Sequence, residues 1–214
     1  MSKLSETPPE NLTAPGSALP PPEFSLDQRR TLLGIAHQAI LSALEGQPFP
    51  DAPPSSPALL EPRGVFTTLY EPGDRPGDLR HQLRGCVGYA LPMVSLYRAV
   101  AETARAAAFD DSRFLPVAMD EAHVLQVSLS VLSRLFPIHP DAVEVGRHGL
   151  LISDGARRGL LLPQVPVENG WDRETFLEQT CRKAGLPSDA WRKSATIEAF
   201  TAEVFSDSDV ELAP

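Results

Sequence analysis

The sequence contains few of the features that several common classes of protein require. Only 2 of its 214 residues are cysteines, Cys86 and Cys181. Because they lie far apart in the sequence, we expect two reduced thiols rather than a disulfide-bonded scaffold. Residues 1–9 contain no apolar core of signal-peptide length, and no later run is long enough to span a bilayer. We therefore expect a cytoplasmic protein with no membrane segment.

Basic residues and the common cofactor motifs are also scarce. The chain has 19 Lys and Arg against 28 Asp and Glu, a net charge of −9, which disfavours nucleic acid as a partner. Neither a Walker loop nor Gly-x-Gly-x-x-Gly occurs, and Cys-x-x-Cys and His-Glu-x-x-His are absent. No cofactor and no metal is therefore predicted. A metal site assembled from Cys86, His148 and Glu168 is kept as a minor alternative.

The distribution of proline and acidic residues predicts one folded region with two tails. Residues 1–23 are rich in Pro, Ser, Thr and Glu, a composition typical of a disordered arm. Residues 207–214 are acidic and predict a frayed tail. Residues 24–206 remain as the folded domain, long enough to bury a substantial core in one body or two fused lobes.

Local signals within this region predict a mixture of helices and hairpins. Ser25 and Gln28 form a capping-box pattern before a helix that ends near Gly46, and Asp172 is a predicted N-cap for a helix to Lys183. A third helix is expected from Pro92. Alternating apolar residues and turn residues predict strands at 64–70, 83–88, 125–131, 148–155, 160–163 and 200–204, with loops at 48–62 and 71–82. This pattern favours an α+β fold rather than a doubly wound parallel sheet.

The strongest candidate for chemistry is the block Leu83-Arg84-Gly85-Cys86-Val87-Gly88. Gly85 and Gly88 permit close approach of a backbone or a ligand, and Arg84 offers a fork of donors to an anion. Cys86 is a nucleophile if its thiolate is stabilised, or else a small buried hydrophobe. Cys181 lies in an amphipathic helix and is expected only to pack.

Further polar residues cluster in later blocks. Arg147 and His148 stand at the start of a predicted strand, and Glu168 follows the next one as either a base or the partner of Arg147. Because the blocks combine arginine, cysteine and histidine with glycine, we expect Arg84 and Cys86 to share one cleft with Arg147 and His148. Asp110 and Asp111 lie at the end of a predicted helix, where negative charge is unfavourable. An ion pair with a buried arginine such as Arg84 would offset this cost.

Several ordered blocks together resemble the AMMECR-type domain family, whose bacterial and archaeal members are also called AmmeMemoRadiSam system protein A. The resemblance covers about residues 26–206. It rests on blocks 83–88, 107–114, 145–150 and 159–165, and on Trp171 before a helix. The proline-rich loop and Ser112 in place of a more usual proline depart from the family pattern. The resemblance implies a two-lobed α+β fold, with a mainly antiparallel sheet flanked by helices and a cleft near the cysteine strand. It also implies association with Memo-like and radical-SAM proteins.

Two functional hypotheses follow from these blocks together with the family resemblance, which is the source of the modification role. In the first, Arg84, Gly85, Gly88 and Arg147 bind an anionic small molecule or peptide, and the protein is a modification enzyme. Cys86 would then be the nucleophile or redox group, with His148 or Glu168 as proton acceptor. In the second, the same cleft belongs to a non-catalytic adaptor or binding module in which Cys86 is structural. Fast, pH-dependent alkylation of the thiol near neutrality would favour the first hypothesis.

Overall fold

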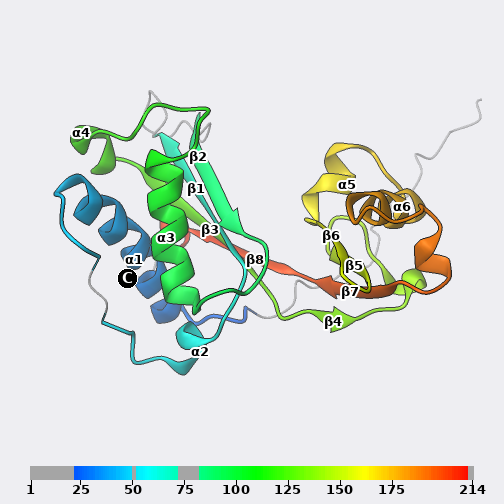
Figure 1. Ribbon diagram of the computed structural model, residues 1–214. Coiled ribbons are helices and arrows are strands. Elements are labelled where there is room, and N and C mark those ends of the chain that lie inside the picture. The colour runs from blue at the N-terminus through cyan, green and yellow to red at the C-terminus, as the bar shows by residue number, and fades with distance from the viewer. Residues whose placement is uncertain (1–21, 50–51, 72–81, 212–214) are drawn as a thin grey trace, which may run out of the picture.

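The computed structural model describes residues 22–49, 52–71 and 82–211, which form two lobes of helices and strands (Figure 1). The predictions for residues 1–21, for nearly all of the loop at 71–82 and for the last three residues lie outside this part of the chain. Both lobes are built on antiparallel sheets, so the predicted two-lobed α+β architecture is confirmed.

The first lobe contains a four-stranded sheet with helices on one face. Its strands, in spatial order, are β2 (Gln82–Tyr89), β1 (Val65–Glu71), β3 (Gln126–Leu132) and β8 (Ala202–Ser206). The helices are α1 (Leu26–Leu44) and α3 (Leu96–Phe109), with the shorter α2 (Pro57–Leu60), α4 (Met119–Ala122) and α7 (Asp207–Glu211). Helices α1 and α3 pack against each other, and α3 lies on β1 and β2.

The second lobe repeats this architecture with shorter elements. Its strand order is β4 (Phe136–Pro137), β7 (Thr196–Phe200), β5 (Gly149–Asp154) and β6 (Arg157–Leu161). Helix α6 (Arg173–Lys183) packs on β5 and β6, and the short α5 (Gln164–Glu168) follows β6. The 3-10 turns η1 (Pro140–Ala142) and η2 (Ala190–Arg192) complete the lobe.

Alternation along the strands explains why the first sheet has one covered and one open face. Val65, Leu69 and Leu129 are fully buried in the core that the sheet forms with the helices. Their neighbours Phe66 and Ser130 are only partly buried, because successive side chains of a strand point to opposite faces. These neighbours line a space that the second lobe borders on its other side. The open face of the sheet therefore faces the second lobe.

The predicted helix caps are confirmed, because each depends on residues three positions apart. Ser25 Oγ accepts from the Gln28 N–H at 3.3 Å, and Gln28 Oε1 accepts from the Ser25 N–H at 2.8 Å. Asp172 Oδ1 accepts from the Thr175 N–H at 2.8 Å and caps α6. Such bonds need no distant partner, so the sequence alone can specify them.

Other expected boundaries are wrong. Helix α3 begins at Leu96, after Ser95, rather than at Pro92. The single strand expected at 200–204 is two strands in different sheets, because the chain leaves the second lobe after Phe200 and enters the first at Ala202. The loop at 48–62 contains the helical turn α2. Alternation in sequence cannot show that a strand changes sheet.

The start of the acidic tail is folded rather than frayed. Residues 207–211 form α7. Asp207 Oδ2 accepts from the Val127 N–H at 2.7 Å and lies 2.9 Å from His37 Nε2. The aspartate therefore joins the end of the chain to strand β3 and helix α1.

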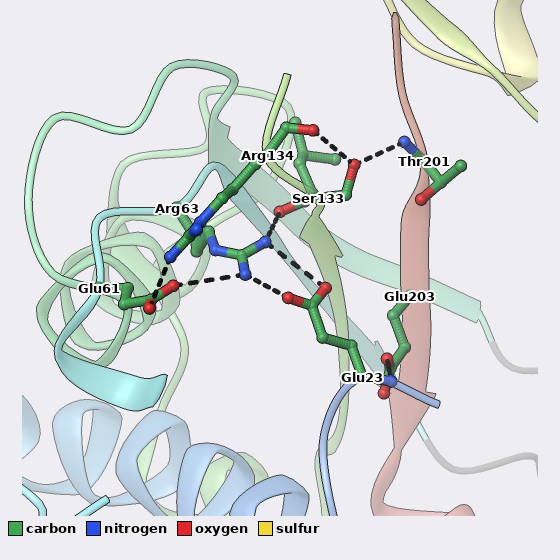
Figure 2. Close-up of polar contacts among 8 residues, drawn as sticks. Glu23, Glu61, Arg63, Ser133, Arg134, Thr201 and Glu203 are labelled. Carbon is green, nitrogen blue, oxygen red and sulfur yellow. Dashed lines mark hydrogen bonds and ion pairs between the residues drawn. The ribbon is translucent and has the colours of Figure 1, made fainter. Parts of the chain in front are cut away.

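The two segments that cross between the lobes are bonded to each other (Figure 2). The Ser133 N–H donates to the Thr201 carbonyl at 2.8 Å, and the Thr201 N–H donates to Ser133 Oγ at 3.0 Å. These bonds continue the antiparallel pairing of β3 with β8 into that of β4 with β7. The lobes are thus joined by a two-stranded ribbon rather than by two independent linkers.

A buried arginine ties this ribbon to the rest of the first lobe (Figure 2). The side chain of Arg63 is only 7% exposed; its Nη1 donates to the Leu132 carbonyl at 3.3 Å, and its Nη2 pairs with Glu23 and, at 3.5 Å, with Glu61. Glu61 also pairs with Arg134 at 2.7 Å. Glu23 is the last residue of the expected disordered arm, but its ion pair with Arg63 fixes it to the folded domain, so the expectation is wrong for this residue.

A cleft between the lobes as the candidate functional site

The open face of the first sheet and the second lobe enclose a cleft of about 580 Å³. Most of its lining is apolar, with a few polar side chains on each wall. The first lobe contributes Thr68, Cys86 and Ser130, and the second contributes Arg147, Gln164 and Glu168. A concave, mostly apolar space with few polar groups is the usual form of a small-molecule site.

Cys86 lies on the edge strand of the first sheet and is partly exposed. It is paired with Thr68 of β1, whose Oγ1 donates to Cys86 Sγ at 3.4 Å. The Cys86 N–H points away from β1 and donates to Asp111 Oδ2 at 2.9 Å. An unpaired edge N–H would otherwise need water or another strand, so Asp111 fixes the backbone beside the thiol.

Asp111, which accepts the hydrogen bond from Cys86, in turn accepts hydrogen bonds from Arg113 in the same block, 107–114. Arg113 donates to both Asp111 oxygens, from Nε at 2.9 Å and from Nη2 at 2.7 Å. These hydrogen bonds keep the pKa of Asp111 well below its ordinary range, and the bond from the Cys86 N–H adds to the effect. The expected ion pair between Arg84 and Asp110 or Asp111 is wrong.

Arg84 is directed away from the cleft by a bulge in β2. Leu83 pairs with Tyr70 and Gly85 with Leu69, so Arg84 is an extra residue between consecutive partners. A bulge of this kind breaks the two-residue alternation that would otherwise place Arg84 beside Cys86.

The buried Arg84 instead binds two carboxylates. Its Nε donates to Glu121 Oε1 of α4 at 2.9 Å, and its Nη2 donates to Glu121 Oε2 at 3.2 Å. Glu71 Oε1 lies 3.4 Å from the Arg84 Nε. The arginine lowers the pKa of Glu121, chiefly through the hydrogen bonds. Arg84 is not among the residues that line the cleft.

The two glycines of the cysteine block accommodate protein groups rather than the cleft. A Cβ on Gly85 would lie 2.1 Å from the Ala107 carbonyl oxygen of α3. A Cβ on Gly88 would lie 2.3 Å from the ring of Phe66, which covers that glycine from β1. Gly149 is covered in the same way by Phe200 in the second sheet. Close approach by another group explains each glycine.

On the second wall, Arg147 and Glu168 come from neighbouring segments. Gly146 has a φ of +86° and turns the chain against α5, where a Cβ on it would lie 3.2 Å from Val167 Cγ2. Arg147 Nη1 donates to both carboxylate oxygens of Glu144 at 3.1 Å. Glu144, and not Glu168, is therefore the partner of Arg147.

His148 is buried beside the cleft but does not line it. Its Nδ1 accepts from the Glu144 N–H at 3.0 Å, and its ring meets that of Phe136 edge-on. Burial lowers the pKa of His148, and Arg147 contributes in the same direction against the opposing effect of Glu144. The ring is therefore neutral near pH 7, with its proton on Nε2.

This burial predicts that His148 makes folding weaker in acid. Because its pKa is lowered in the folded state, the unfolded chain takes up the proton first, and stability is lost as the pH falls below about 6.5. In His148→Gln, whose amide can still accept the Glu144 N–H, the free energy of unfolding should vary less between about pH 7 and about pH 5. Denaturant titrations across this range measure the slope. The exposed His139→Gln is the control, and an unchanged slope in His148→Gln would contradict the assignment.

Of the residues singled out from the sequence, the cleft brings together Cys86, Arg147 and Glu168. Arg84, Gly85, Gly88 and His148 are not among its lining residues. Sequence reasoning missed Thr68 and Ser130, although their alternation with buried residues marks the open face of the sheet. The described residues contain no cluster of three or more side chains suited to a metal, and none of their helices is long and apolar enough to cross a membrane.

Comparisons with known proteins identify similar chains. A family model named AMMECR1 matches residues 33–205. A protein of Thermococcus gammatolerans is 45% identical over 168 residues, which are 75% of this chain and 79% of that protein. Protein MK0488 of Methanopyrus kandleri is 39% identical over 199 residues, covering 88% of this chain and 93% of that protein. The crystal structure of uncharacterized protein PH0010 from Pyrococcus horikoshii matches with a TM-score of 0.61 and 40% identity, covering 82% of this chain and 89% of that one.

Proposed function

We propose that this chain, which belongs to the AMMECR1 family, binds an anionic small molecule or peptide in the cleft between its lobes. The proposal rests on one observation. Three segments far apart in sequence bring a thiol, a guanidinium and a carboxylate to a single, mostly apolar cleft of about 580 Å³. Small-molecule sites commonly combine such a lining with a few polar groups that orient the ligand.

Arg147 is the group best placed to bind the anion. Glu144 engages only its Nη1, and its Nε and Nη2 make no hydrogen bond to the described part of the chain. These nitrogens can donate to a carboxylate or phosphate oxygen in the cleft. Arg84, the other arginine expected to do so, already binds Glu121.

The geometry supports binding more directly than catalysis. Cys86 and Glu168 line the cleft, whereas the buried His148 does not. An enzyme in which Cys86 is the nucleophile and Glu168 the proton acceptor is therefore the second candidate. An adaptor with a structural Cys86 is the other alternative. The association with Memo-like and radical-SAM proteins stays a prediction from the family resemblance.

The thiol of Cys86 provides a test of the proposed site. Iodoacetamide should label Cys86 and spare Cys181, which is 0% exposed and whose pKa is raised by burial. Inorganic phosphate, a small anion, should slow labelling of Cys86 by occupying the space next to Arg147. The measurement is the labelling rate at Cys86, followed by mass spectrometry, as a function of phosphate concentration.

Matched arginine variants separate binding in the cleft from a general effect of phosphate. Protection should be lost in Arg147→Gln and retained in Arg192→Gln, which removes a half-exposed arginine that pairs with Glu174 and does not line the cleft. Equal protection in both variants, or none in the native protein, would overturn the proposal. Rapid labelling near neutral pH with a clear pH dependence would favour the catalytic candidate.

A further inference from the structure

The two charged residues among the described lining of the cleft, Arg147 and Glu168, do not form an ion pair with each other. Arg147 shares its charge with Glu144, which does not line the cleft. Glu168 does line it, yet its carboxylate forms no hydrogen bond or ion pair with any of the described residues. The cleft therefore presents one partly neutralised cation and one carboxylate that has no partner in the described part of the chain.

Both charges stand on the wall that the second lobe provides. The residues next to them, Gly146 and Val167, approach closely, so the turn that carries Arg147 and the helix that carries Glu168 are neighbours. The described residues of the first lobe line the cleft with hydroxyl, thiol and apolar groups, and none of these lining residues is charged. A ligand would therefore meet both charges on one side and an uncharged surface on the other.

From this arrangement we infer that the ligand carries a cationic amine as well as an anionic group, so that Glu168 binds the amine while Arg147 binds the anion. The inference rests on the proposed function: it keeps the anionic group that binds Arg147 and adds an amine, on the same ligand, that binds Glu168. The shared chemistry is that of a zwitterion, either a free amino acid or a short peptide. Its apolar part would lie against the remaining lining of the cleft.

A ligand of one charge sign fits this wall less well. A dianion would place its second negative charge near Glu168, and like charges in a partly enclosed space repel. A simple cation would leave the free donors of Arg147 without an acceptor. A zwitterion satisfies both groups and adds no net charge to an already acidic protein.

Disulfide probes of different charge can report on this site through Cys86. In each exchange the Cys86 thiolate attacks one sulfur of the probe, a new disulfide forms, and the other half leaves as a thiolate. The probes are cystine, which is zwitterionic at each end, cystamine, which is cationic, and dithiodipropionate, which is anionic. Each rate is divided by that of the native protein with the same probe, because the probes differ in intrinsic reactivity.

Glu168→Gln should lower the rate at which Cys86 exchanges with cystine and with cystamine by about three-fold, the size expected for removing one charge near a partly solvated thiol. It should not lower the rate with dithiodipropionate. Arg147→Gln should slow cystine and dithiodipropionate and spare cystamine. The control Glu45→Gln makes the same charge change at the end of α1, away from the cleft, and should alter none of the rates. Glutathione disulfide distinguishes a peptide ligand from a free amino acid. If both Glu168→Gln and Arg147→Gln slow its exchange with Cys86, the ligand is a peptide. If the two variants slow exchange with cystine but not with glutathione disulfide, the ligand is a free amino acid.

If Glu168→Gln leaves both cystine and cystamine unchanged, the inference is wrong, whereas a loss with Arg147→Gln would still support the anion site. If Arg147→Gln also leaves the exchange rates with cystine and dithiodipropionate unchanged, the proposed function is wrong as well. A second measurement does not need the thiol. In Cys86→Ser, the melting temperature should rise more with glycylglutamate or glycine than with propionate or propylamine, because only a ligand of the folded state stabilises it. Equal shifts with all four compounds would also overturn the inference.

Discussion

Replacing Gly85 by valine will destabilise the protein by about 3 kcal/mol or more, the upper range for forcing extra atoms into a packed interior. A Cβ at this position would lie 2.1 Å from the Ala107 carbonyl oxygen, and that atom belongs to the backbone of α3 rather than to a flexible side chain. The strand and the helix cannot both keep their positions. For a chain of this length the expected fall in melting temperature is about 10 °C.

The control for this prediction is another glycine with open space around it. Gly34 is exposed on α1, and a Cβ there would meet nothing within 4 Å. Gly34→Ala should therefore raise stability by about 0.5–1 kcal/mol, the usual gain from replacing glycine inside a helix. Calorimetry and denaturant titration measure both variants. A Gly85→Val protein as stable as the native one would show that the close approach of β2 and α3 is wrong.

Replacing Arg63 by methionine will destabilise the protein by about 2 kcal/mol. Methionine keeps an apolar stem but removes the hydrogen bond to Leu132 and the ion pairs with Glu23 and Glu61. Removing one partner of a buried ion pair costs about 3–5 kcal/mol. The smaller value is expected because both carboxylates are partly exposed and because the buried Nε of Arg63 has no hydrogen-bond partner among the described residues.

Arg134→Gln is the matched control, since Arg134 belongs to the same cluster and pairs with Glu61 at 2.7 Å. Its side chain is 73% exposed, and an exposed pair contributes about 0–1 kcal/mol. Comparing the free energies of unfolding of the two variants isolates the effect of burial. Equal losses would indicate that Arg63 contributes only as one more surface charge.

The cysteine block illustrates which parts of the site could be predicted. The residue types and glycine spacing marked this segment for attention, and the structure places Cys86 at a cleft. Its neighbour Arg84 could not be located in the same way, because the bulge that redirects it depends on the register between β2 and β1. Register is set by pairing across strands and by packing against the helices, neither of which is visible in a local sequence pattern.

The second block shows a similar division. Arg147 and His148 are adjacent, but Arg147 belongs to the turn that follows Glu144, and His148 is the last residue before β5 begins. The expectation that both would face one cleft did not take this turn into account. Arg147 lines the cleft, whereas His148 is buried against Phe136. The bond from the Cys86 N–H to Asp111 was also missed, because it joins an edge strand to a loop 25 residues away.

The sequence by itself determined the α+β class, the capped starts of α1 and α6, and the residues worth testing. These features depend on hydrogen bonds between residues a few positions apart and on alternation within one strand. Only the tertiary structure decided that Phe200 and Ala202 belong to different sheets, that Glu121 rather than Asp111 binds Arg84, and that Cys86, Arg147 and Glu168 share a cleft. Each of these outcomes depends on which distant segments pack together, and that is settled by the burial of the whole core rather than by any local pattern.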